Sequence, residues 1–597
     1  MRTSIATVCL SGTLTEKLHA CAAAGFDGVE VFEPDLVASH TSPEEVVALA
    51  DRLGLTLDLY QPFRDAEGVD EDAFEAVLRR AEAKFVLMQR LRIDTLLVCS
   101  NVATATVDDP EVSAHQLRRL GDLAAPYGVR LAYEALAWGR YVSDYRDAWR
   151  IVELADHPAV GVCLDSFHIL SRGHDPAGIE EIPGDRIFFL QLADAPAMTL
   201  DVLSWSRHHR LFPGEGSFDL VGFLGHVVAT GYAGPLSLEV FNDTFRQTDV
   251  LRTAQQARRS LAWLADGVAG LDSLPPAQQP TGFDFVEVKA EDATDIDVLL
   301  RQLGFAFRGR HRTKPVRLWT QGGARVVCNE QQARDVPPTL AAVGVEVPDP
   351  DVGAARANAL EAPAVYRRTY AGEQQLPAFR APDGTEIYLA PEARGDAAWV
   401  PEFEGGGGRE DQPPPLITGI DHVNLAHPWQ AFDEAVLFYS SVLALTPEAG
   451  QEVAAPTGLV RSQVVRTRDG GVRLALNVAP PAYDTTAGGM AQHVAFSSTD
   501  ALAVARAATD RGLRPLPIPA NYYDDLLARF DLDPGLVGDL AAHGVMFDRD
   551  DTGEFVHFYT ATVGGLFLEV VERRGGYQGY GAPNAPVRLA AQHVAAR

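Results

Sequence analysis

Residues 161–170 read GVCLDSFHIL and combine a strand-like apolar run with two titratable side chains. The run from Gly161 to Leu164 suits a buried strand, yet it ends in Asp165 and is followed three positions later by His168. A buried carboxylate without a partner is costly. The stretch therefore predicts a strand whose end either satisfies Asp165 locally or turns it toward a functional site.

The same kind of short β-rich run occurs eight times between the start of the chain and about Leu271. The runs are SIATVCL, GVEVFEP, LTLDLYQP, DTLLVCSN, VRLAYEAL, VGVCLDSFH, RIFFLQLAD and PLSLEVFN. Amphipathic helical patterns such as SPEEVVALADRLG separate them. Eight β/α repeats in about 270 residues match a TIM barrel. A doubly wound open sheet is the alternative, but no GxGxxG follows the first strand. We predict an α/β TIM barrel over residues 1–273.

Polar residues end the last four of these runs, and they are Glu134, Asp165, Gln191 and Glu239. Because the carboxyl ends of barrel strands meet at one face, we expect the four side chains to converge. Three carboxylates at close range need a counter-charge, which a divalent cation supplies. All-oxygen ligation suits a hard ion such as Mg²⁺ or Mn²⁺. The alternative is that each residue only caps its strand or forms half of an ion pair.

Titratable side chains lie beside these strand ends. His168 has a pKa suited to a general base near neutrality, although a loop histidine that caps the next helix is equally consistent. Arg64 follows the third run, and Arg207 and Arg210 lie in the loop after the seventh. Arginine forks bind carboxylates well, so we predict that these three contact a small-molecule carboxylate substrate.

The sequence changes character after a Pro/Gln-rich linker predicted at 274–282, LPPAQQPTG. Residues 283–400 carry several strand patterns and a single helix-like stretch, DIDVLLRQLGF. A Gly/Pro-rich linker is predicted at 401–415, and residues 416–597 repeat the order of strand, helix and strands twice. We predict an α+β region of repeated βαβββ units, separate from the barrel.

Three residues of the ligand type lie inside strand patterns of the last region, namely His422, His493 and Glu569. Two histidines and one carboxylate make the facial triad of non-haem Fe(II) oxygenases, which leaves positions open for other ligands. A single strand histidine is usually a core or surface residue, but three at repeat-related positions favour a second metal site. The first half, 283–400, has no matching ligands and is predicted to be silent.

Composition limits the partners. The formal charge is −30, with 81 acidic against 51 basic residues, which disfavours nucleic acid and anionic membranes. The five cysteines are odd in number and form no CxxC, as in a protein with reduced thiols. The opening MRTSIATVCLSG is too short for a signal peptide. We expect a cytoplasmic protein that forms a homo-oligomer.

The barrel resembles the sugar-phosphate isomerase/epimerase superfamily through R-x-x-P-G-E-G at residues 210–216. The segments LYQPFRD, YEALAWGRY, CLDSFH, LQLADAP and LSLEVFND are similar to those of bacterial two-domain 3-dehydroshikimate dehydratases. The resemblance implies a hydro-lyase that converts 3-dehydroshikimate to protocatechuate. It also implies Mg²⁺, Mn²⁺ or Co²⁺ on the four strand-end ligands. A sugar or inositol isomerase/epimerase is the alternative.

The C-terminal region resembles 4-hydroxyphenylpyruvate dioxygenase of the vicinal-oxygen-chelate superfamily. The segments YYDDL, HGVMFDRDDTGEFVHFYT and FLEVVERRGGYQGYGAPN carry this resemblance. It implies Fe²⁺ or Mg²⁺ on the triad and leaves open a dioxygenase activity of this half. Two departures fall in or near the implied pocket. His557 stands where the family has Gln in LLQIFT, and APVRLAAQ replaces a Phe-rich helix end.

Overall fold

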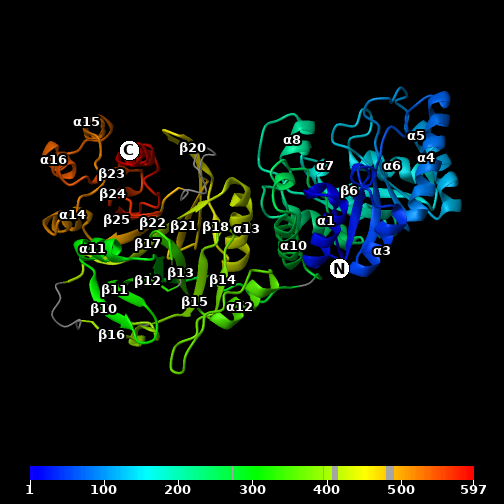
Figure 1. Ribbon diagram of the computed structural model, residues 1–597. Coiled ribbons are helices and arrows are strands. Elements are labelled where there is room, and N and C mark those ends of the chain that lie inside the picture. The colour runs from blue at the N-terminus through cyan, green and yellow to red at the C-terminus, as the bar shows by residue number, and fades with distance from the viewer. Residues whose placement is uncertain (272, 332–333, 394, 407–413, 479–489, 597) are drawn as a thin grey trace. The chain divides into compact units, whose positions relative to one another are not determined.

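The computed structural model describes residues 1–597 except 272, 332–333, 394, 407–413, 479–489 and 597. It divides the chain into two compact units, Met1–Leu274 and Pro275–Arg597 (Figure 1). Among the described residues, no helix has both the length and the apolar character that crossing a membrane requires.

The first unit is a closed barrel of eight strands in the order β1 to β8, each parallel to its neighbours. The predicted TIM barrel is therefore confirmed. β8 closes onto β1 through the pairing of Leu238 with Ile5. The strands are β1 (Thr3–Ala6), β2 (Gly28–Phe32), β3 (Thr56–Phe63), β4 (Thr95–Cys99), β5 (Arg130–Glu134), β6 (Val160–Asp165), β7 (Ile187–Leu192) and β8 (Leu236–Leu238).

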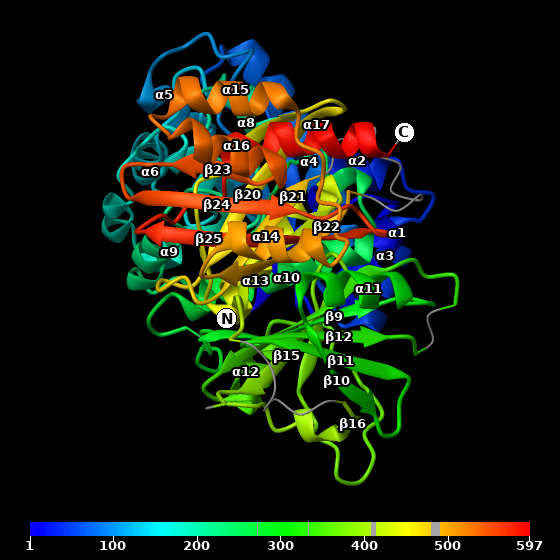
Figure 2. The same ribbon diagram turned by 90° about the vertical axis from the view of Figure 1, so that its left-hand side faces the viewer.

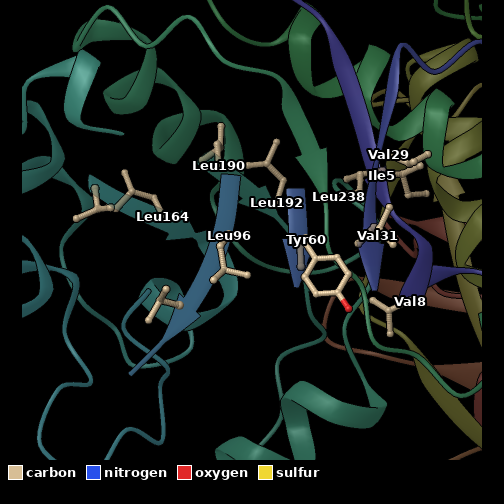
Figure 3. Packing of buried hydrophobic residues seen from close by; sticks show 14 of the residues in the cluster. Ile5, Val8, Val29, Val31, Tyr60, Leu96, Leu164, Leu190, Leu192 and Leu238 are labelled. Carbon is tan, nitrogen blue, oxygen red and sulfur yellow. The ribbon is translucent and has the colours of Figure 1, made fainter. Parts of the chain in front are cut away.

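Apolar strand residues and the helices around them form a large core, and a smaller cluster around Leu97 and Phe189 packs apart from it. Figure 3 shows side chains from several strands packed together, among them Val31, Leu96 and Leu190. Local signals set the helix starts, since Thr13 and Ser42 each form a capping box. The helices are α1 (Leu14–Ala23), α2 (Glu33–Val37), α3 (Pro43–Leu53), α4 (Glu71–Leu91), α5 (Pro110–Ala124), α6 (Tyr145–Ala155), α7 (Ser166–Leu170), α8 (Val202–His208), α9 (Leu220–Ala229) and α10 (Val250–Asp266).

The second unit begins with an eight-stranded sheet in the order β14-β15-β13-β9-β12-β11-β10-β16. Its strands are β9 (Gly282–Lys289), β10 (Ala306–His311), β11 (Val316–Gln321), β12 (Ala324–Asn329), β13 (Thr339–Val347), β14 (Ala378–Arg380), β15 (Glu386–Pro391) and β16 (Phe403–Gly405). Part of the predicted second linker thus forms β16, which pairs with β10, while residues 407–413 lie outside the described residues.

One prediction for this part of the chain is wrong. The sequence indicated a single helix, whereas the structure has α11 (Thr294–Leu303) and α12 (Pro350–Ala359). The buried face of α12 includes Gly353 and Ala357, which are too small to give a clear apolar period. The helix nevertheless has a start signal, because Asp349 caps it directly before Pro350.

A second sheet has nine strands in the order β18-β20-β21-β17-β22-β25-β24-β23, with β19 paired to β20. The strands are β17 (Ile417–His427), β18 (Thr446–Pro447), β19 (Gln451–Ala455), β20 (Gly458–Arg466), β21 (Arg473–Val478), β22 (Gln492–Ser498), β23 (Met546–Arg549), β24 (Gly553–Tyr559) and β25 (Leu566–Gly575). Figure 2 shows β23, β24 and β25 side by side with α14 against them. The helices are α13 (Phe432–Leu443), α14 (Ala501–Asp510), α15 (Ala520–Arg529), α16 (Pro534–Ala542) and α17 (Ala585–Ala595). The predicted α+β repeats are confirmed.

All five cysteines are buried free thiols. Burial raises the pKa of each one, to about 12 at Cys21. These side chains are therefore protonated core residues near neutral pH.

Candidate functional site

The strand ends predicted to form the barrel site lie where the barrel register brings them together. Glu134 and Asp165 are the last residues of β5 and β6, and Glu239 directly follows β8. Asp165 pairs in register with Gln191 of β7, which in turn pairs with Ser237 of β8. All four predicted ligands are buried.

Two of these carboxylates converge with His168. Single ligand atoms of Glu134, Asp165 and His168 lie within 4.8 Å of one another. Glu134 Oε1 is buried and has no hydrogen-bond partner among the described residues. Burial and the nearby carboxylates Glu239 and Asp165 raise the pKa of Glu134 well above its usual value. A cation among these oxygens would satisfy the orphaned atom and relieve the like-charge repulsion, so the residues fit a metal.

Arg210, predicted to contact the substrate, lies among the candidate ligands instead of standing free. It is 1% exposed, and its Nη1 is 2.8 Å from Asp165 Oδ2 and 3.3 Å from Glu239 Oε2. Ser206 accepts hydrogen bonds from its Nε and Nη2, and the guanidinium stacks 4.5 Å from the centre of the Phe167 ring. Arg210 therefore supplies positive charge to the carboxylates.

Glu239 depends on that charge. Burial and Asp165 raise the pKa of Glu239 to about 7, while Arg210 opposes the rise. A second positive charge beside Arg210 would keep Glu239 ionised at neutral pH.

Gln191 is oriented by a residue that the sequence argument missed. Its Nε2 donates to Glu30 Oε2 at 2.6 Å, and Gln61 Nε2 donates to the same oxygen at 3.0 Å. Ser237 donates to the other oxygen of Glu30. Since the amide nitrogen of Gln191 is engaged, its oxygen, which accepts only from the Cys163 thiol at 3.6 Å among the described residues, is the atom that can face a cation. The signal for Glu30 was a carboxylate between two buried valines in GVEVF.

His168 is held so that one ring nitrogen faces the carboxylates. The backbone N–H of Ala137 donates to Nδ1 at 3.1 Å, and Nε2 lies 3.6 Å from Asp165 Oδ2. Trp138 packs against the ring edge to face at 5.0 Å. Burial, with the positive charges of Arg210 and Arg64, lowers the pKa of His168 to about 3. The imidazole is therefore neutral at physiological pH. Because Nδ1 accepts from the Ala137 amide, the one ring proton lies on Nε2, which is also 3.3 Å from Arg210 Nη2.

A cavity of about 80 Å³ opens beside this cluster. Arg64, Arg207, Arg210, His168 and Glu239 are among its lining residues. Unlike Arg210, the side chains of Arg64 and Arg207 form no ion pair with the described residues, although both line the cavity. The structure thus brings the predicted cationic residues together and leaves two of them available to an anion.

The predicted triad of the second unit also converges. His422, His493 and Glu569 come from the adjacent strands β17, β22 and β25. Both His422 and Glu569 pair in register with Ala495, and His493 lies two positions before Ala495 on the same face. Glu569 Oε2 is 3.2 Å from His422 Nε2 and 3.1 Å from His493 Nε2. Three ligand atoms aimed at one point fit a divalent metal.

Further side chains fix these ligands. Asp421 accepts from His422 Nδ1 at 2.8 Å and is itself bound through both oxygens by Arg573, each at 2.8 Å. His557 Nδ1 lies 2.8 Å from the remaining oxygen of Glu569. Hydrogen bonds from the histidines lower the pKa of Glu569 despite its burial. His557 replaces the family's glutamine but keeps a place beside the ligand carboxylate.

The first half of this unit has no ligands at the matching positions. In the second half, His422 of β17 pairs with Ala495 of β22. The corresponding strands of the first half are β9 and β13, in which Phe285 pairs with Gly344, so Phe285 stands at the position of His422. The same register places Ala342 where the second half has His493, and Tyr388 where it has Glu569. Aromatic and small side chains therefore occupy the positions of the triad in this half.

Comparisons with known proteins identify the same kinds of domain in both units. Family models match residues 18–267 as a xylose isomerase-like TIM barrel, 277–399 as the N-terminal part of hydroxyphenylpyruvate dioxygenase, and 419–537 as the glyoxalase/bleomycin resistance protein/dioxygenase superfamily. A 3-dehydroshikimate dehydratase of Pseudomonas putida is 42% identical over 99% of this chain and 98% of its own length. The chain belongs to the 3-dehydroshikimate dehydratase family.

Other family members extend the agreement. A 3-dehydroshikimate dehydratase of Pseudomonas aeruginosa is 42% identical over 100% of this chain and 99% of its own length. A solved xylose isomerase-like TIM barrel/4-hydroxyphenylpyruvate dioxygenase fusion protein is 41% identical, covers 100% of both chains and gives a TM-score of 0.90. The groups of candidate metal ligands and the match to the glyoxalase/dioxygenase superfamily together indicate that the protein uses a divalent metal.

Proposed function

We propose that this protein is a metal-dependent 3-dehydroshikimate dehydratase, a hydro-lyase that converts 3-dehydroshikimate to protocatechuate and water. The observation that carries the proposal is the convergence of Glu134, Asp165 and His168 at the barrel's strand ends. Full-length similarity to enzymes of that name supports it. A sugar or inositol isomerase, or a dioxygenase activity of the second unit, is not favoured, because neither explains similarity to dehydratases over the whole chain.

The proposed metal ligands are Glu134, Asp165, Gln191 and Glu239, with Mg²⁺, Mn²⁺ or Co²⁺ as the ion. When bound, the cation would polarise the ring ketone and acidify the neighbouring C–H bond. Glu30 holds the Gln191 amide so that its oxygen is the ligand atom. For the second unit, we propose that Fe²⁺ or Mg²⁺ binds His422, His493 and Glu569.

The chain's own residues bind the substrate and move protons. Arg64 and Arg207 bind the substrate carboxylate in the cavity. His168 is the proposed base for the proton next to the ketone. Nε2 can accept that proton only in the tautomer that carries its own proton on Nδ1, which gives up the hydrogen bond from the Ala137 amide. Loss of the proton next to the ketone and of the β-hydroxyl as water, followed by tautomerisation, gives the aromatic acid. Trp138 and Phe167 surround the imidazole and shield it from solvent.

The proposed function is tested by mixing the purified protein with 3-dehydroshikimate and following catechol absorbance. We expect product to form, to stop after exhaustive treatment with a chelator, and to resume when Mg²⁺, Mn²⁺ or Co²⁺ is restored. Full turnover by metal-free protein would disprove the metal mechanism. The absence of product with each of the three ions would disprove the dehydratase assignment.

Arg64→Ala is expected to weaken substrate binding more than chemistry. Removing one charge-assisted contact to the carboxylate should raise KM about 10- to 100-fold, with kcat reduced less than about 5-fold. Arg79→Ala serves as the control, because Arg79 is an exposed residue of α4 and does not line the cavity. A variant with unchanged KM would remove Arg64 from the carboxylate site.

Three further proposals concern the whole protein. We propose the domain limits 1–273, 283–400 and 416–597 and a homo-oligomeric state, which limited proteolysis and light scattering test. We also propose a cytoplasmic location, which the buried, reduced thiols support.

A further inference from the structure

The triad of the second unit opens into a cavity of about 80 Å³. His422, His493 and Glu569 line it together with Arg588 of α17. Arg588 belongs to the segment APVRLAAQ, in which the chain departs from the 4-hydroxyphenylpyruvate dioxygenase pattern. The departure therefore brings a positive charge to the cavity that holds the candidate metal ligands.

Arg588 is buried, and no counter-charge pairs with it among the described residues. It is 8% exposed, and its guanidinium lies 5.6 Å from the ring centre of Tyr559 and 5.5 Å from that of Phe567. Nη1 donates to Gln592 Oε1 at 2.8 Å. Throughout the part of the chain that the structure describes, no carboxylate pairs with it. A buried charge is costly unless an anion compensates it, so this position points to an anionic ligand.

Other polar atoms of the lining also lack partners. Asn477 Oδ1 and the Tyr580 hydroxyl are buried and make no hydrogen bond within the described residues. The Tyr580 ring stands edge to face against His422 at 5.7 Å. Native buried polar atoms are rarely left unpaired, so a ligand with hydroxyl groups would satisfy both.

The candidate metal site indicates which groups of a bound molecule would face it. A facial triad leaves adjacent coordination positions open, which suit a molecule with two neighbouring oxygen atoms. Aromatic and aliphatic side chains such as Tyr559 and Leu589 also line the cavity. The cavity therefore combines candidate metal ligands, apolar side chains and a cation.

We propose that this cavity binds a small hydroxylated aromatic carboxylic acid, with its adjacent oxygens toward the triad metal and its carboxylate on Arg588. The product of the barrel, a catechol bearing a carboxylate, has this chemistry, and we infer that it is the ligand. That identification rests on the proposed dehydratase function. The second unit is then a product-binding site, and no further chemical step is required of it.

The test separates the two metal sites within the full-length chain. Glu134→Gln and Asp165→Asn together disable the barrel site, and Zn²⁺, which is redox-inert, is supplied to the second unit. Calorimetric titration then compares protocatechuate with catechol, which lacks the carboxylate. We expect the acid to bind about 10- to 100-fold more tightly than catechol. Removing the second metal site by His422→Ala should abolish binding of both.

The decisive variant is Arg588→Met, which keeps the aliphatic stem but removes the charge. It should weaken binding of the acid to the level of catechol and leave catechol binding unchanged, while Arg588→Lys should recover part of the difference. Arg461→Met is the control, because Arg461 is an exposed residue of β20 whose strand neighbours Val460 and Ser462 line the cavity. An unchanged affinity for the acid, or an equal loss for both ligands, would overturn the carboxylate site.

Failure of the two proposals can be told apart. If wild-type protein forms no catechol from 3-dehydroshikimate but the acid still binds through Arg588, the dehydratase assignment fails and the carboxylate site stands. If the barrel forms protocatechuate and the second unit does not bind it, the product-binding inference alone fails.

Discussion

Glu134→Gln is expected to lower kcat by roughly 10³-fold, because it removes an anionic ligand from the barrel metal. Electrostatic stabilisation by a bound metal is worth several kcal/mol, and each ~1.4 kcal/mol is about tenfold in rate. The substitution preserves side-chain size but adds an amide nitrogen, which donates hydrogen bonds and cannot bind a cation. Parallel measurements of kcat and of metal content by mass spectrometry check the result.

A stability measurement shows whether such a loss comes from misfolding. The raised pKa of Glu134 means that its ionised form destabilises the metal-free protein at neutral pH. That penalty grows as pH rises from the usual glutamate range toward the raised value. A neutral amide at this position avoids the penalty, so the metal-free variant should unfold at the same or a higher urea concentration than the wild type.

Glu153→Gln, at an exposed position of α6, is the control for the activity measurement. Full activity with normal metal content would remove Glu134 from the site.

Arg573→Met is expected to destabilise the triad region by about 3–5 kcal/mol. Arg573 is the bidentate partner of Asp421. Its removal leaves this buried carboxylate with weaker compensation, from His422 Nδ1 at 2.8 Å and Arg473 Nη1 at 3.9 Å. Hydrogen exchange of peptides from β17 and β25 reports the local free energy of opening. The neighbouring Arg574 pairs with Glu572 at a more exposed position, so Arg574→Met should cost about 0–1 kcal/mol. Equal effects of the two substitutions would contradict this account.

The pH dependence of the same region follows from Asp421. Its pKa lies below the usual value through hydrogen bonds from Arg573 and His422, despite burial. Its contribution to stability is therefore complete above the unfolded pKa of about 3.9 and is lost as pH falls toward the lower folded value. In Arg573→Met the pKa of Asp421 should rise toward the unfolded value, so the loss of stability between about pH 4 and lower pH should be smaller than in the wild type. Exchange measured as a function of pH tests this.

The fold was easiest to predict from the sequence in the first unit, where a strand followed by a helix repeats eight times. Eight strand patterns separated by amphipathic helices predicted a closed barrel, because few other architectures accommodate that order at that length. The register that brings Asp165 beside Gln191 then follows from closure. The helix α12 escaped prediction, since its buried face contains small residues that give a weak hydrophobic period.

The candidate sites were predictable in their strand-end and strand-centre residues but not in their supports. Glu30 and Arg573 are distant in sequence from the ligands they orient, so only the folded chain brings them close. The position of Arg210 shows a different limit. Residue type indicated an anion-binding side chain, but the structure shows that the anions it contacts are Asp165 and Glu239 of its own barrel.

The burial of the five thiols has a consequence for an enzyme that releases a catechol. Air oxidation converts catechols to quinones, which are electrophiles that attach covalently to accessible thiolates. Every cysteine of this chain is enclosed and held as the protonated thiol by its raised pKa. We therefore expect the buried thiols to react slowly with such quinones during prolonged turnover.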